Sequence, residues 1–185
     1  GNYAISASSF SSSGSSTARA NLNASTVTVS SASGISFTNA AFTLSAGTSQ
    51  INLTSTGGAP LGGGGRVFYN VSFLGSTASA APNITGANTF NNLTFTSPAS
   101  ASVIRVQFGA TQTINGTLTG SGASETRRIF YSSDTLGTAR TLTLANPTTL
   151  TNCDFRDITA ATSAITATGG GDCGGNTSIT FPIPK

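Results

Sequence analysis

The chain has 185 residues, enough for one domain with a buried core, and only 7% of them are charged. It contains no His, Met or Trp, and its formal net charge is +3. This composition excludes His-dependent catalysis, and the basic residues are too scattered for a nucleic-acid surface, which needs a basic patch interleaved with aromatic side chains.

Small polar residues separate the apolar residues along most of the chain. Ser, Thr, Asn and Gly compete with helical hydrogen bonding, whereas Thr, Val, Ile and Phe suit a pleated surface, so the composition predicts an all-β fold. Apolar residues make up 37% of the chain and include eleven Phe. That is enough apolar surface to offset the entropy of ordering, so we expect a folded chain.

The beginning of the chain is rich in Ser, and Ser8 to Ser16 has low complexity. We expect residues 1–33 to form an N-terminal segment or cap and residues 34–185 to form the β domain. Alternating apolar and polar residues predict strands in five further runs. These runs are residues 26–30, 50–54, 103–108, 127–131 and 141–144.

A hexapeptide of the form apolar-x-Asn-apolar-x-Phe occurs four times. The copies cover residues 37–42, 68–73, 90–95 and 150–155 and contain seven of the eleven Phe residues. Positions 1 and 4 of a straight strand face opposite sides, so burying positions 1, 4 and 6 together requires a bend. Asn at position 3 tolerates the left-handed conformation and bonds nearby backbone, so we predict that it forms a corner.

The spacing of the copies predicts a parallel β-solenoid in which each coil contributes one corner. A degenerate copy at residues 112–118 fits the long interval between the third and fourth copies. Stacked coils would place the corner residues in a ladder with a spacing of about 4.8 Å. The predicted corner residues are Asn39, Asn70, Asn92, Asn115 and Asn152. A β-sandwich is the alternative fold, but it gives no reason to repeat one hexapeptide.

The two cysteines, Cys153 and Cys173, do not have the spacing of a metal site. Their separation is close to one predicted coil, which would place them on neighbouring strands. We therefore expect a disulfide in preference to two free thiols, provided that the geometry allows it.

Candidate catalytic residues are few. The acidic residues are Glu125, Asp134, Asp154, Asp157 and Asp172. They form no evident catalytic pair or cation site, so we predict no enzymatic activity, no cofactor and no metal. Exposed Ser, Thr and Asn rows, with Tyr69 and Tyr131, would suit carbohydrate binding, although the same rows are typical of any soluble sheet face.

Several segments resemble repeats in large virion appendage proteins of tailed bacteriophages, and similar repeats occur in bacterial surface proteins. The resembling segments are residues 68–73, 84–93, 109–116, 152–158, 171–176 and 179–181. The resemblance covers about residues 66 to 181 and lies in corner and core positions, so it transfers no catalytic residue.

This resemblance implies a structural component of a phage virion, such as a tail fibre, spike or decoration protein. It also implies an extracellular location on the virion surface. The expected partners are copies of the chain, other virion proteins and a host-surface glycan, with neither nucleic-acid binding nor membrane insertion. A bacterial extracellular adhesin or filament module is the first alternative, and a carbohydrate-binding or carbohydrate-active β-helix domain is the second.

Overall fold

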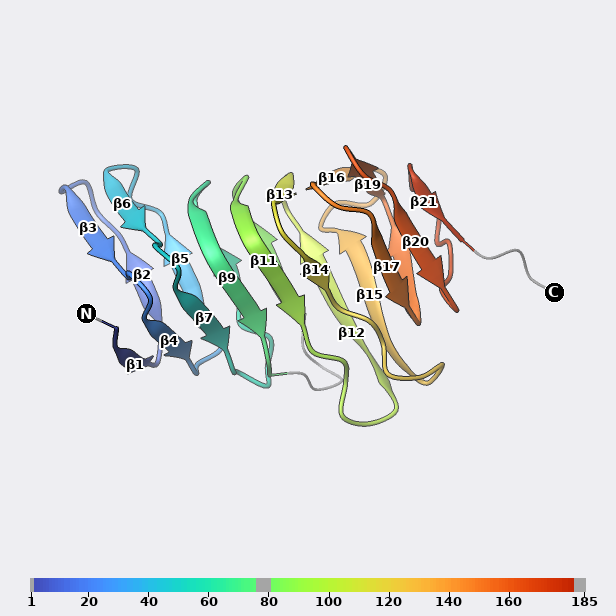
Figure 1. Cartoon of the computed structure of the whole chain (residues 1–185), viewed down its shortest axis with the longest axis horizontal. Helices are drawn as coiled ribbons and strands as arrows, with labels where there is room; N and C mark the ends of the chain where they lie inside the picture. Colours follow the sequence, from blue (N-terminus) through green and yellow to red (C-terminus); the bar gives the residue numbers. More distant parts are fainter. Residues whose placement is uncertain (1, 76–80, 182–185) are drawn as a thin grey trace.

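The computed structural model describes residues 2–75 and 81–181, and all the regular elements among them are β-strands (Figure 1). None of these residues forms a helix that could cross a membrane. The strands are, in chain order, β1 (Ala4–Ala7), β2 (Phe10–Ser12), β3 (Ala18–Asn21), β4 (Thr26–Val29), β5 (Ile35–Phe37), β6 (Phe42–Ser45), β7 (Gln50–Leu53), β8 (Leu61–Gly62), β9 (Val67–Phe73), β10 (Asn83–Thr85), β11 (Thr89–Phe95), β12 (Ser102–Phe108), β13 (Gln112–Ile114), β14 (Leu118–Thr119), β15 (Arg127–Ser133), β16 (Arg140–Leu144), β17 (Thr148–Thr151), β18 (Cys153–Arg156), β19 (Ile158–Ala161), β20 (Ile165–Thr168) and β21 (Ile179–Thr180).

The strands stack in parallel, coil upon coil, along the long axis of the molecule (Figure 1). Among the described residues, every pairing between named strands is parallel. The predicted all-β parallel solenoid is therefore confirmed. The alternative β-sandwich is wrong, because sandwiches are built from antiparallel strands.

Each coil contributes strands to three faces. Face B is one seven-stranded sheet in the order β2, β5, β8, β10, β12, β15, β18. Face A contains β1, β4 and β7, continues through the second halves of β9 and β11 to β14, and resumes after a break in the ladder with β17, β20 and β21. Face C contains β3 and β6, the first halves of β9 and β11, and then β13, β16 and β19.

Strands β9 and β11 bend as they pass from face C to face A. Phe68 and Val71, three positions apart in β9, are both buried, as are Phe90 and Leu93 in β11. In a straight strand, side chains three positions apart point to opposite sides. The bend inferred from the hexapeptide is therefore present in these two copies.

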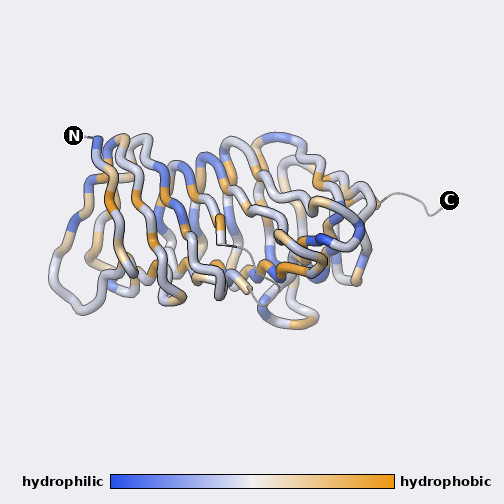
Figure 2. Tube along the Cα trace, turned by 90° about the horizontal axis from the view of Figure 1, so that it is seen from below, coloured by the Kyte–Doolittle hydropathy of each residue, from blue (hydrophilic) through white to orange (hydrophobic). Residues whose placement is uncertain are grey.

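The core is a column of apolar side chains along the axis. The rings of Phe68 and Phe90 stack with centroids 5.5 Å apart, and those of Phe73 and Phe95 stack at 5.0 Å. Such pairs contribute about 0.5–1.5 kcal/mol each beyond the burial of their area. Figure 2 shows the sequence pattern behind this column, with hydrophobic segments returning in coil after coil between hydrophilic ones.

The coils shorten toward the C-terminal end. In the first coil Ala4 pairs with Thr26, whereas in the last Ile165 pairs with Ile179, which is a much shorter separation along the chain. The ring of Phe181 then packs edge-on against the core side chain of Phe155, with centroids 6.1 Å apart. This end of the described solenoid is therefore narrow, and an aromatic ring covers part of its core.

The Ser-rich N-terminal segment takes part in the stack. Strand β1 pairs with β4, β2 with β5, and β4 with β7. The hydrogen-bonded ladder thus runs across the boundary that the sequence led us to expect after Ser33.

Candidate functional site

The predicted corner asparagines occupy three different corners. Asn70 and Asn92 are register partners, and Asn92 Nδ2 donates a hydrogen bond of 2.9 Å to Asn70 Oδ1. Asn115 follows β13 at the same corner, where faces C and A meet. Asn39 instead lies between β5 and β6, where face B leads to face C, and Asn152 lies between β17 and β18, at the entry to face B.

The prediction of one ladder through all five asparagines is therefore wrong. Each coil has three corners, and copies of the hexapeptide lie at all three. The copies beginning at Phe68 and Phe90 stack because the separation between them equals one local coil. The numbers of residues between the other copies do not equal whole numbers of coils, so these copies lie at different corners.

Of the five predicted corner asparagines, one adopts the left-handed backbone conformation. Asn152 has a φ of 54°. Asn39 makes its corner with side-chain hydrogen bonds: Oδ1 accepts from the Ala41 amide at 2.8 Å, and Nδ2 donates to the Ser16 carbonyl at 2.8 Å. A side-chain amide can thus stabilise a corner in place of a positive φ.

Sequence reasoning missed the amide pair that is most deeply buried. Asn88 is 1% exposed and Gln112 0%, and Asn88 Nδ2 donates to Gln112 Oε1 at 3.1 Å. Both lie at the corner between faces B and C. Their remaining polar atoms bond backbone, with Asn88 Oδ1 accepting from Gly65 N and Gln112 Nε2 donating to the carbonyls of Gly86 and Ala110. The Gly-Ala pair that shortly precedes each residue was the available signal.

The expected disulfide does not form, and Cys153 and Cys173 are free thiols. The local coil is short, since Phe155 bridges to Asp172, and Cys173 is therefore three positions beyond the residue opposite Cys153. Cys153 is buried, and Cys173 is exposed. Burial raises the pKa of the Cys153 thiol to about 11, and also raises the pKa of Cys173.

Four of the five carboxylates accept hydrogen bonds from neighbouring groups, including Asp172, whose Oδ1 accepts from Gly174 N at 2.9 Å and from Asn176 Nδ2 at 2.7 Å. Arg128 Nε donates to Asp154 Oδ2 at 2.8 Å, and Arg140 NH2 donates to Asp134 Oδ1 at 2.8 Å. The hydrogen bond from Arg140 lowers the pKa of Asp134. Asp157 is buried and accepts a hydrogen bond from the Gly137 amide at 3.0 Å. Among the described residues, no three His, Cys, Asp or Glu side chains form a group that could hold a metal ion.

Tyr131 is not available to stack on a ligand. Its side chain is fully buried, and its hydroxyl donates to the Gly120 carbonyl at 2.7 Å. Burial raises the pKa of this phenol well above its ordinary value. Tyr69 is only partly exposed, on the outer side of β9.

The outer side of face A is uncharged over many coils. Its strands present two polar side chains that flank one buried apolar residue, so two columns of hydroxyl and amide groups run along the axis. The triplets are Thr26-Val27-Thr28, Gln50-Ile51-Asn52, Asn70-Val71-Ser72, Asn92-Leu93-Thr94, Thr117-Leu118-Thr119, Thr149-Leu150-Thr151 and Thr166-Ala167-Thr168. The recurrence of Thr-apolar-Thr was a visible signal for these columns.

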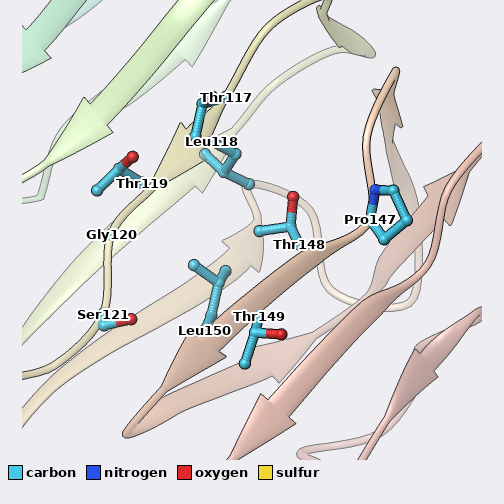
Figure 3. A pocket seen from close by; sticks show the side chains of 9 residues that line it. All are labelled: Thr117, Leu118, Thr119, Gly120, Ser121, Pro147, Thr148, Thr149 and Leu150. Carbon is cyan, nitrogen blue, oxygen red and sulfur yellow. The ribbon is translucent and has the colours of Figure 1, made fainter.

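Two hollows lie next to each other on this face. The first has a volume of about 320 Å³ and is lined from four successive strands by Gln50, Asn70, Ser72, Asn92, Thr94, Thr117 and Thr119. The second has a volume of about 240 Å³ and lies between β14 and β17 (Figure 3). Thr117 and Thr119 line both hollows, so the two form one depression, which we call the axial groove.

The second hollow exists because β14 and β17 do not pair along their length. Among the described residues, hydrogen bonds join the two segments at the ends of the hollow. Asn146 Nδ2 donates to the Gly116 carbonyl at 3.0 Å, Thr151 N donates to Ser121 Oγ at 3.0 Å, and Gly122 N donates to the Thr151 carbonyl at 2.8 Å. Pro147, just before β17, has no amide hydrogen to offer to β14. Figure 3 shows Thr148 and Pro147 across the gap from Leu118.

The fold and this groove define the chain as a parallel β-solenoid with a polar, uncharged outer face. Comparison with protein-family models, curated proteins and solved structures found no match to the chain.

Proposed function

We propose that the chain is a non-enzymatic structural module of an extracellular virion appendage, namely a tail fibre, spike or decoration protein of a tailed bacteriophage. The observation that carries the proposal is the uninterrupted apolar column beneath outer faces of small polar side chains. In the described part of the chain, parallel ladders link the coils on all three faces, continuously on face B and with one break each on face A, between β14 and β17, and on face C, between β6 and β9. Such a stack is a rod in which each coil is held by its neighbours, which suits a load-bearing appendage.

The positions of the carboxylates support a role without catalysis. Asp134 and Asp154 pair with arginines, and Asp157 is bound by a backbone amide. No acidic side chain is among the described residues that line the axial groove. Acid–base hydrolysis of a polysaccharide would need carboxyl groups that converge on such a groove.

The N-terminal end of the described solenoid has edge strands beside an apolar hollow. Strands β1 and β2 lie at the ends of their sheets. An apolar hollow of about 210 Å³ lies beside them and is lined by Ile5, Phe10, Leu22 and their neighbours. Edge strands beside an apolar surface readily pair with a further strand.

Immunogold electron microscopy tests the assignment. Gold-labelled antibodies against the chain are applied to negatively stained particles from the culture that produces it. They are expected to label phage appendages, with several gold particles on each virion. Antibody absorbed beforehand with the pure chain is the control and should leave particles unlabelled. Label confined to bacterial cell envelopes would contradict the virion role and favour the adhesin or filament alternative.

A reducing-end assay tests the absence of enzymatic activity separately. The chain, incubated with mixed polysaccharides, is expected to release no more reducing ends than a heat-treated sample. Release above that control would overturn the non-enzymatic assignment and favour a carbohydrate-active domain.

A further inference from the structure

The axial groove has the hydrogen-bonding capacity of a binding site. Among the described residues, Asn70 Nδ2 has no hydrogen-bond partner, and neither does Gln50 Oε1. The hydroxyl groups of Thr94, Thr117 and Thr119 likewise bond no described residue. The groove therefore offers both donors and acceptors, as a ligand rich in hydroxyl groups requires.

Several of these groups are already held in position. Asn70 Oδ1 accepts from Asn92 Nδ2 at 2.9 Å, and Asn92 Oδ1 accepts from the Thr117 amide at 2.8 Å. Gln50 Nε2 donates to Ser72 Oγ at 3.0 Å. Side chains that are fixed before binding lose less conformational entropy when a ligand arrives.

The lining also limits the chemistry of the ligand. No charged residue lines either hollow, whereas face B carries Arg128, Asp154 and Arg156. Between β14 and β17 the ring of Pro147 adds exposed apolar surface, whereas Leu118 and Leu150 form the buried floor. Threonine methyl groups add further apolar surface. The groove can therefore contact the C–H groups of a ligand as well as bond its O–H groups.

The groove is elongated. It crosses β7, β9, β11 and β14 and ends at β17. Neighbouring strands of a sheet are about 4.8 Å apart, so these five strands give a length of roughly 20 Å or more. This is a linear site, suited to several units of a polymer.

We propose that the axial groove binds a neutral polysaccharide chain lying along the solenoid axis. This inference goes beyond the structural role proposed above, because a rod module needs only a soluble outer face. The repeating hydroxyl groups would bond the two polar columns, and the C–H faces of the sugar rings would contact the methyl groups and the prolyl ring.

Affinity electrophoresis in native gels tests the proposal. The full chain is run with and without dextran, laminarin or galactomannan as neutral polymers and with alginate as a charged one, and the ratio of the two mobilities is measured. We expect retardation by at least one neutral polymer and none by alginate. Retardation by none of the three neutral polymers, or by alginate alone, would overturn the proposal.

A pair of matched variants locates the site. Thr119→Arg fills the groove, and Thr43→Arg adds the same charge on the outer side of face C, where Thr43 is also exposed. Thr119→Arg is expected to weaken retardation at least about tenfold, equivalent to about 1.4 kcal/mol, while Thr43→Arg leaves it unchanged. Thr94→Arg, on a second strand of the groove, should repeat the loss. Equal retardation of the three variants would place binding elsewhere and refute the groove.

Discussion

Cysteine shows how strongly position within a coil decides the chemistry of a residue. Cys153 points into the apolar column, where its thiol also lies 3.2 Å from the Gly120 carbonyl, whereas Cys173 is exposed near the C-terminal end. Thiolate, not thiol, reacts with alkylating agents, so a thiol with its pKa raised to about 11 is almost unreactive at neutral pH.

We predict that iodoacetamide modifies one cysteine in the folded chain and two in denaturant. Peptide mass spectrometry should place the native modification on Cys173, with Cys173→Ser abolishing it. The reaction of Cys173 should accelerate as pH rises, because its raised pKa leaves little thiolate near neutrality. Two results would contradict this thiol arrangement. One is modification of Cys153 in the native state, and the other is a loss of two hydrogen atoms from the intact mass under oxidising conditions, which would indicate a disulfide.

At the scale of the strand and its corner, buried amides fix the bends. The Asn88–Gln112 pair is buried and bonds backbone on three successive coils, through Gly65, Gly86 and Ala110. Removing one member leaves several buried polar atoms without partners, and each such atom costs about 1–3 kcal/mol.

We therefore predict that Asn88→Ala lowers the free energy of unfolding by at least about 2 kcal/mol. Asn115→Ala is the matched control, because its side chain is exposed, and it should change the free energy by no more than about 0.5 kcal/mol. Urea denaturation followed by circular dichroism measures both. Equal effects of the two substitutions would show that burial of the amide pair does not stabilise the corner.

At the scale of the whole molecule, the solenoid is a nearly one-dimensional stack. Contacts between strands connect mostly neighbouring coils, so a defect should weaken its own coil and the two beside it more than distant ones. Phe90 offers a test, because it is fully buried and stacks on Phe68 of the preceding coil.

We predict that Phe90→Ala destabilises the chain by about 3–5 kcal/mol. Hydrogen exchange measured by mass spectrometry should accelerate most in β9, β11 and β13 and least in β1 and β20. Phe130→Ala is the control, since Phe130 is only partly buried on the outer side of β15, and its effect should be smaller. Uniform acceleration along the whole chain would indicate a single cooperative unit instead of a stack.

The sequence by itself determined the fold class and much of the core. The hexapeptide and the alternating runs depend on local rules, namely side-chain parity and strand propensity, and these rules hold in whichever coil a segment lies. Positions 1, 4 and 6 of the copies beginning at Phe68 and Phe90 are accordingly all buried.

Only the tertiary structure decided which residues meet. The corner that each Asn occupies, the distance between Cys153 and Cys173, and the gap between β14 and β17 all depend on the summed length of every coil before them. Coil length is not constant, as the long step between the partners Ala4 and Thr26 and the short step between Ile165 and Ile179 show. A local sequence pattern does not give the lengths of the other coils. The axial groove and the buried Asn88–Gln112 pair could therefore be identified only from the stacked coils of the tertiary structure.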